Sequence, residues 1–297
     1  MDLGVDSTKV GLSLDDMRGY KGGALSPVTA LTNASVENSV SGLSLAPTVM
    51  ENQDMCRFGV DVDLGDNTKM LLSSGFSESA FAQTQESVLA GNDAKSFAQD
   101  VEIRHNVTDH SWLSLTTGIM NETDTVLGSY FSGSADANGS KTTYQVVSAG
   151  LGLTDDTTLV GAFGYANTQV DEAAEMDFDS LKSTNLTLGL VNRDVMNQGD
   201  ALTVSYREPL RVTEGSGYLS QATGYDTTNG GYTFANQRYD LSAEGQEQTV
   251  EMGYTMQPEL VGSSDALGLV VGYSKDYGNV AGEDNTKIFC TEHKAFS

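Results

Sequence analysis

Basic side chains are scarce in this chain. Only 16 lysine and arginine residues stand against 41 aspartate and glutamate residues among 297, which gives a formal net charge of −25. A surface of that sign repels phosphate backbones, so nucleic acid is excluded as a partner. Such acidity is typical of solvated loops or of a protein adapted to a salty medium.

Cysteine is also nearly absent. Cys56 and Cys290 are too few for a disulfide scaffold and lack the spacing of a metal site. They fall in the first and last of the strands predicted below, which are neighbours if a barrel closes. A disulfide across the seam and two unpaired thiols are both open, and the short distance that a disulfide requires favours the thiols. No cofactor is predicted.

Long apolar runs and a leader are not found either. No run reaches 18 apolar residues, which excludes a membrane-spanning helix but not a membrane-spanning β-barrel. The N-terminus, MDLGVDSTKVGLSLDD, has neither a basic n-region nor an apolar h-region, so no signal peptide is visible. With only 4 prolines and 32 glycines, and with polar turn residues between apolar runs, the composition favours many short strands.

Alternation of apolar and polar residues is the main signal from about residue 57 onward. In TTYQVVSAGLGLTDDTTLVGAFGYANTQ, the residues Val147 to Leu153 alternate, Asp155-Asp156 turns the chain, and Leu159 to Tyr165 resume the same parity. Each arm has about ten residues, the length that crosses a bilayer at a tilt. About twelve such runs predict an all-β, antiparallel up-and-down barrel over residues 57–297.

Residues 1–56 read as a linker that threads the pore of this barrel. They are weakly periodic and rich in serine, glycine, asparagine and threonine. Ser26-Pro27 has the pattern of a helix start, which predicts a short helix through Val28 and Leu31.

Several polar and aromatic residues have two interpretations. The acidic string at residues 171–180 could hold calcium, but it lacks the spacing of a calcium loop, so a solvated loop is favoured. His105 and His110 flank a predicted turn, and with His293 they are interpreted as ordinary surface residues. Aromatic residues near strand ends are either membrane-interface girdles or ordinary strand residues: Trp112, Tyr144, Tyr165, Tyr206, Tyr254 and Tyr273. The arginines either line the barrel interior or lie on the surface: Arg57, Arg104, Arg193, Arg207 and Arg238.

Three strings interrupt the alternation: GIMNETDTVLGSYFSGS, YREPLRVTEGSGYL, and YDTTNGGYTFANQRYDL followed by SAEGQEQ. In this order they resemble the C-terminal barrel region of subtilisin-like serine protease autotransporters of Gram-negative bacteria. The resemblance covers roughly residues 57–280. It is carried by a set of family-motif residues: Glu122, Leu127, Gly128, Ser129, Gly133, Pro209, Leu210, Arg211, Tyr225, Asp226 and Arg238.

The resemblance implies an outer-membrane translocator or anchor of type V secretion. Its partners would be outer-membrane lipid, the barrel-assembly machinery and a passenger N-terminal to this chain. The family's catalytic triad lies in a subtilisin domain that this sequence does not contain, so the chain is predicted not to be an enzyme, with no catalytic, cofactor or metal residue. The alternatives are a soluble, secreted acidic barrel or sandwich accessory to such a protease, and a small porin-like channel.

Loop lengths conflict with the membrane interpretation. If twelve strands begin in the periplasm at residue 57, the short turns face outward and the long connections face inward, the reverse of the usual arrangement. Either the strand count is off by one, or the orientation is unusual, or the barrel is not in a membrane. Outward-pointing charges at Asp61, Asp63, Glu102 and Glu251 would exclude a membrane barrel, whereas an apolar band about 25 Å tall would support one.

Overall fold

The computed structural model describes residues 10–16, 53–79, 95–127, 138–171, 176–256 and 266–293. In these ranges the chain is almost entirely antiparallel β-structure, with one short 3-10 turn, η3 (Tyr277–Asn279). Among the described residues, none of the helical segments is long and apolar enough to cross a membrane.

A single meander of twelve strands forms the large sheet, and each strand pairs with the next in the following order. The strands are β1 (Val10–Asp16), β2 (Gln53–Gly65), β3 (Thr68–Ser79), β4 (Lys95–Thr108), β5 (Ser111–Thr123), β6 (Gly139–Gly152), β7 (Thr157–Val170), β9 (Leu181–Arg193), β10 (Ala201–Glu214), β13 (Gln248–Met256), β14 (Ala266–Lys275) and β15 (Asn285–His293).

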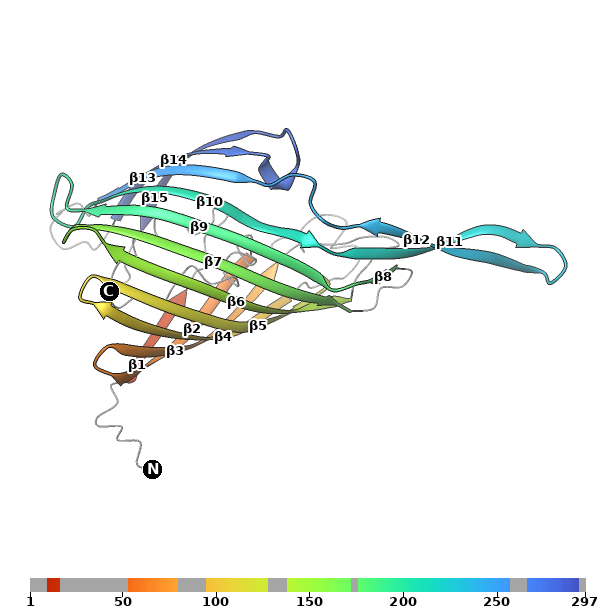
Figure 1. Ribbon diagram of the computed structural model, residues 1–297, viewed down its shortest axis with the longest axis horizontal. Coiled ribbons are helices and arrows are strands. Elements are labelled where there is room, and N and C mark those ends of the chain that lie inside the picture. The colour runs from red at the N-terminus through yellow and green to blue at the C-terminus, as the bar shows by residue number, and fades with distance from the viewer. Residues whose placement is uncertain are drawn as a thin grey trace, which may run out of the picture.

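The sheet coils about a long axis, so that β2 and β3 lie behind β6, β7 and β9 (Figure 1). β1 and β15 are the two edge strands of the sheet, and among the described strands no pairing joins them. The predicted antiparallel up-and-down fold of about twelve strands is confirmed.

A second, three-stranded sheet projects from one end of the large one. It contains β8 (Met176–Phe178), β11 (Ser216–Asp226) and β12 (Gly231–Asp240), in the order β12-β11-β8. The long hairpin of β11 and β12 extends away from the barrel wall (Figure 1). The sequence interpretation placed this region within the range 57–297 but did not count it among the barrel strands, because it treated these residues as strings that interrupt the alternation.

β1 is the strand that the sequence interpretation missed. Val10, Leu12 and Leu14 pair with Val62, Val60 and Phe58 on β2, so part of the range assigned to a linker lies in the sheet, and the boundary at residue 57 falls inside β2. The helix expected at Ser26 lies outside the described residues.

Counting β1 as the first strand changes which end of the sheet the chain starts from, and with it the side on which the short turns lie. β1 begins opposite Val62, near the short β2–β3 turn, and β15 ends at His293 opposite Ala266, at the same end of the sheet. Both described ends of the sheet therefore lie on the side of the short turns. The longer connections, including the one that carries the β11–β12 hairpin, lie at the opposite end. The reversed loop arrangement came from starting the count at β2.

The two faces of the sheet have opposite character. Along β4, β5 and β6, buried and exposed residues alternate strictly over most of each strand. Among the described residues, 25 buried side chains are polar or charged and only 15 are hydrophobic. The concave inner face is therefore largely polar, and the outer face carries the large apolar residues.

Candidate functional site

The inner face of the barrel is the region where chemically distinctive side chains converge. Glu102 and Glu251 are only 4% and 5% exposed, on the inner face. Asp61 and Asp63 alternate with Val60 and Val62 on β2, and they pair with buried Leu71 and with Lys69. All four carboxylates that would have excluded a membrane barrel by pointing outward thus lie on the inner side.

On three neighbouring strands, a tyrosine side chain lies over a glycine of the middle strand. Asp100 on β4 pairs with Gly118 on β5, and Gly118 pairs with Tyr144 on β6. The Tyr144 hydroxyl crosses β5 to donate a 3.0 Å hydrogen bond to Asp100 Oδ2. A Cβ at position 118 would overlap the Tyr144 ring, so glycine is required there. Ser73 on β3 also donates to Asp100, which extends the network over four strands.

A second ring lies over a second glycine nearer the short turns. Trp112 on β5 pairs with Gly150 on β6, and a Cβ at position 150 would overlap the indole. The Arg104 guanidinium lies 4.1 Å from the centroid of the Trp112 ring, a cation–π arrangement. Trp112 and Tyr144 are 5% and 2% exposed, so of the two interpretations left open for them the membrane-interface girdle is excluded.

The remaining aromatic and basic residues divide between the two faces. Tyr165 and Tyr273 are 40% and 47% exposed on the outer face, where a girdle would lie. Arg207 shares the inner face with Glu251, because it pairs with buried Thr249. Arg207 Nε and Glu251 Oε2 are buried without a hydrogen-bond partner.

Glu122 organises the start of the first non-alternating string. Its carboxylate accepts hydrogen bonds from the Leu127 backbone N–H at 2.8 Å, the Ser140 hydroxyl at 3.0 Å and the Thr125 hydroxyl at 3.2 Å. The chain before it is not a loop, because β5 continues to Thr123. Of the polar residues that suggested a loop, Glu122 is at an inward-facing strand position, and Asn121 and Thr123 are exposed at the end of the strand. The motif residues Gly128, Ser129 and Gly133 lie outside the described residues.

The second string contains a β-bulge in β10. Pairing with β9 shifts between Glu208 and Arg211, and pairing with β13 ends at Arg207. Pro209 lies in this interval, where its missing N–H removes no ladder hydrogen bond. The Arg211 guanidinium donates to Gln246 Oε1 and to the Ala243 carbonyl, each at 3.2 Å. The second string therefore contacts the segment that follows the third.

Leu210 completes this junction. Its carbonyl accepts a 3.1 Å hydrogen bond from Asn279 Nδ2, while Asn279 Oδ1 accepts one from the Glu247 backbone N–H at 3.0 Å. Tyr225, Asp226 and Arg238 lie instead on the projecting hairpin. Glu122, Leu127, Leu210 and Arg211 thus make structural contacts at the end of the barrel that carries the long connections.

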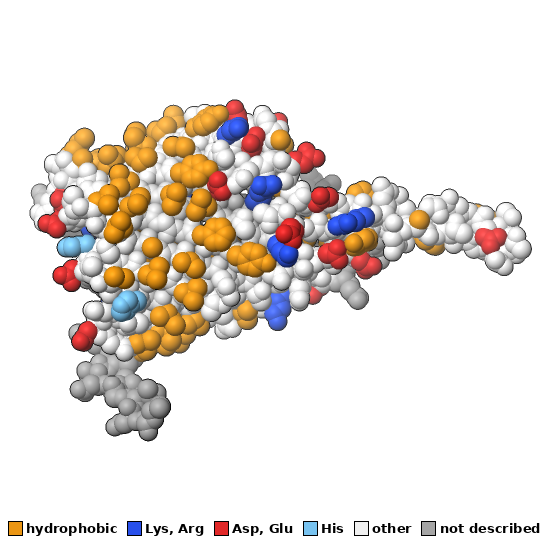
Figure 2. Space-filling view, in the orientation of Figure 1, with side chains coloured by type: hydrophobic (Ala, Val, Ile, Leu, Met, Phe, Trp, Pro, Cys, Tyr) orange, Lys and Arg blue, Asp and Glu red, His pale blue; other side chains and the backbone are white. Residues whose placement is uncertain are grey.

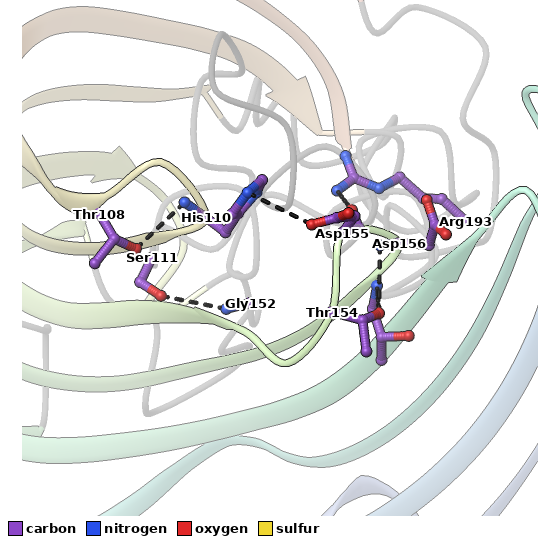
Figure 3. Close-up of polar contacts among 9 residues, drawn as sticks. Thr108, His110, Ser111, Gly152, Thr154, Asp155, Asp156 and Arg193 are labelled. Atoms are coloured by element: carbon purple, nitrogen blue, oxygen red, sulfur yellow. Dashed lines mark hydrogen bonds and ion pairs between the residues drawn. The ribbon is translucent and has the colours of Figure 1, made fainter.

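The histidines predicted at a turn are at the short-turn end, where three neighbouring turns touch (Figure 3). His110 Nε2 lies 3.7 Å from Asp155 Oδ1, with the two side chains 57% and 93% exposed. Arg193 Nη2 donates to the Asp155 carbonyl at 3.5 Å. His105 Nδ1 contacts the Thr68 hydroxyl at 2.9 Å at an exposed position. These contacts join turns to one another at the surface.

The other sequence candidates have simpler outcomes. Cys56 lies in β2, one strand in from the edge, so β1 intervenes between it and β15, which carries Cys290, if the sheet closes. The premise that the two cysteines lie in neighbouring strands was wrong. In the acidic string, Met176–Phe178 form β8, and Asp179 accepts a 3.2 Å hydrogen bond from Tyr218. No group of potential metal ligands occurs among the residues that the structure describes.

The fold and inner face define an antiparallel β-meander with a polar interior. No family model matches the sequence, and no curated protein matches it. Among solved structures, LpxR from Salmonella typhimurium is similar, with a TM-score of 0.36 and 12% identity over 98% of this chain and 100% of that chain.

One prediction is corrected here. The chain was expected not to be an enzyme because the sequence lacks a subtilisin triad, but that absence concerns one class of protease and excludes no other activity. The prediction is withdrawn. At this TM-score the similarity assigns no activity to the chain.

Proposed function

We propose that this chain is a transmembrane β-barrel of the bacterial outer membrane. The observation that carries the proposal is the distribution of side chains, which is the inverse of that in a soluble barrel. Large hydrophobic residues are exposed on every strand of the large sheet whose side chains are described, from Leu64 on β2 to Ile288 on β15. In a soluble barrel these residues would fill the core, whereas a lipid-exposed barrel places them outward and keeps polar residues inside.

The outward residues form an apolar outer face. It is built from Leu72, Phe76, Phe97, Ile103, Leu113, Leu115, Ile119, Val147, Leu151, Leu159, Phe163, Tyr165, Leu188, Leu190, Val204, Val250, Met252, Leu269, Val271, Tyr273 and Ile288. Figure 2 shows hydrophobic side chains across the middle of the visible wall, with most charged side chains toward its ends. Lipid contact along the middle and water at both ends account for this arrangement.

Topology supports the same proposal. Both ends of the meander and the short turns share one end of the barrel, and the longer connections share the other. An even number of strands with short periplasmic turns and longer outer loops is the arrangement of single-chain bacterial outer-membrane barrels. The projecting hairpin then lies outside the cell. The exposed apolar face weighs against the soluble alternative, because it would remain in contact with water.

Within this class, we propose the narrower role of translocator or anchor for an autotransporter. Its support is the order of the three motif strings and the hydrogen bond from Arg211, in the second string, to Gln246, in the segment that follows the third. The partners would be outer-membrane lipid, the barrel-assembly machinery and a passenger. Because β1 begins at Val10 on the short-turn side, a pore-threading segment would precede Val10 and would not comprise all of residues 1–56.

The test is to express the chain with a signal peptide in a Gram-negative host and to fractionate the envelope. We expect recovery in the outer membrane and faster migration of the unheated protein in a denaturing gel, because a closed barrel resists the detergent until it is boiled. A soluble periplasmic product without heat-modifiable migration would refute the membrane proposal.

The narrower role needs a separate readout. A reporter domain fused ahead of Val10 should become accessible to protease added to whole cells. The matched control is the same reporter fused after residue 297, which should stay protected at the periplasmic side. Equal protection of both reporters in a barrel that inserts normally would refute translocation and leave the membrane proposal intact.

A further inference from the structure

The β11–β12 hairpin presents a row of aromatic rings that the barrel does not use. Every residue of β12 is exposed, and β8 pairs with β11 only at Gly217 to Leu219, near the base of the hairpin. Figure 1 shows the hairpin extending well beyond the wall. Its side chains are therefore available to a partner on both faces.

One face of this hairpin carries the rings. Tyr225 pairs with Tyr232, and Ala222 pairs with Phe234, which puts the three rings on the same side. Their exposed fractions are 56%, 68% and 64%. The Tyr225 and Tyr232 rings meet edge to face, with centroids 5.2 Å apart. We call this set of Tyr225, Tyr232 and Phe234 the ring face.

The opposite side of the hairpin is different. Toward the tip that side is small or polar, since Gly224 pairs with Thr233 and Gln221 pairs with Ala235. Nearer the base it carries Leu219 and Tyr239, and the Tyr239 hydroxyl accepts a 3.2 Å hydrogen bond from Gln221. Two-stranded ribbons in water have no need to gather rings on one side, because neither side is a core. The asymmetry indicates a surface for a partner.

The hairpin is held in shape without the rings. At its tip, Asp226 accepts hydrogen bonds from the Thr228 N–H at 2.8 Å and from Asn229 Nδ2 at 2.6 Å. At its base, Arg238 donates twice to the Ser216 hydroxyl, at 2.7 and 3.0 Å. A surface fixed in this way loses little conformational entropy when it binds.

Charge limits the kind of partner. Between Ser216 and Asp240 the only charged residues are Asp226, Arg238 and Asp240, and the first two are engaged in the contacts above. The ring face itself is neutral, while the chain carries a net charge of −25. An anionic polymer would be repelled by the rest of the molecule, and a cationic one would be drawn to the acidic surface elsewhere.

We propose that the ring face binds a neutral glycan. A sugar ring offers an apolar face of C–H groups that packs on an aromatic ring, and hydroxyl groups at its edge that pair with polar neighbours. Tyrosine hydroxyls, Ser220 and Asn236 supply such neighbours on the same side of the hairpin. Attraction to an anionic lipid surface would require a cluster of basic side chains, and the only basic residue between Ser216 and Asp240 is Arg238, which is engaged with Ser216.

The experiment uses the full chain refolded in a detergent without a sugar headgroup, so that the detergent does not occupy the site. The probes are maltohexaose, cellohexaose, laminarihexaose and N-acetylchitohexaose, each followed by saturation-transfer NMR and by titration. We expect saturation of the C–H protons of at least one probe. Tyr232→Ala and Phe234→Ala should each weaken its binding by about 2- to 12-fold, the range for one aromatic contact.

The matched control variants are Thr233→Ala and Gln237→Ala on the opposite side, which should leave binding unchanged. Heat-modifiable migration shows separately that each variant still forms the barrel, so failure here is distinguishable from failure of the membrane proposal. The inference is overturned if none of the four probes binds, or if control and ring variants lose binding equally. It is also overturned if the rings instead mediate dimerisation or binding to vesicles of phosphatidylethanolamine and phosphatidylglycerol.

Discussion

The hydroxyl of Tyr144 on β6 reaches across Gly118 on β5 to the carboxylate of Asp100 on β4, at 3.0 Å. The contact joins strands that are not adjacent, so it depends on the residue between them. A larger residue at position 118 would displace the ring and leave a buried carboxylate with one partner fewer.

Gly118→Ala should therefore destabilise the barrel. We expect a loss of about 1–3 kcal/mol in the free energy of unfolding, from the displaced ring and the overpacked wall. Tyr144→Phe, which removes only the hydroxyl, should cost about 1 kcal/mol. Urea unfolding in lipid vesicles, followed by the fluorescence of Trp112, measures both. Gly161→Ala is the control, because its Cβ would meet the flexible Leu188 side chain at 3.2 Å and the Thr187 carbonyl only at an ordinary contact distance of 3.9 Å.

A charge on the apolar outer face tests the membrane proposal at a single residue. Val147 is 49% exposed on the outer side of β6. In a bilayer, Val147→Arg should cost about 2–4 kcal/mol, whereas Leu64→Arg beside the β2–β3 turn should cost about 0–1 kcal/mol. Refolding yields and urea midpoints in vesicles report the difference. Equal, negligible costs at both positions would fit a soluble protein, where exposed substitutions change stability by less than about 0.5 kcal/mol.

The turn at the tip of the hairpin should respond to acid. The Thr228 backbone N–H and the Asn229 side chain hold the pKa of Asp226 below its ordinary value. The hydrogen bonds of the turn are therefore fully present above the ordinary pKa of an aspartate and are lost as the pH falls through the lowered value. NMR shifts of the Thr228 and Asn229 amide protons should titrate together in that acidic range. Asp226→Asn should abolish this titration, and its persistence would show that another group controls the turn.

Replacing Arg211 by lysine should lower the stability of the protein. Its guanidinium reaches both Gln246 Oε1 and the Ala243 carbonyl, and a lysine ammonium cannot reproduce that fork. Arg211→Lys should lower stability by about 1–2 kcal/mol and should increase protease cleavage at residues 241–247. Arg193→Lys, which loses one 3.5 Å contact at an exposed turn, is the control and should have little effect.

The fold class could be predicted from alternation, because an apolar residue at every second position specifies which side of a strand faces lipid or core. Strand β1 carries the same signal in Val10, Leu12 and Leu14, but a single run of seven residues beside polar sequence was not recognised as a strand. That omission alone reversed the expected orientation of the loops.

The polar interior was harder to predict. Gly118 and Glu122 looked like loop residues because they were judged against an apolar core, whereas here the buried side of the strand is polar. The contact between Arg211 and Gln246 joins residues 35 positions apart, and no local pattern encodes it. The segments that form β11 and β12 interrupt the alternation, which marked them as different from the barrel strands, but only the pairing shows that they form a hairpin outside the large sheet.

The ring laid across Gly118 also distinguishes correct from incorrect assembly. A slip of β6 by two residues along β5 keeps every side chain on its proper side, so alternation alone would accept it. Such a slip would set Tyr144 against Thr116 or Met120, whose side chains fill the space that Gly118 leaves open. The glycine and the tyrosine thus fix the register of β6 against β5, because a barrel with this slip would place two side chains in the same space.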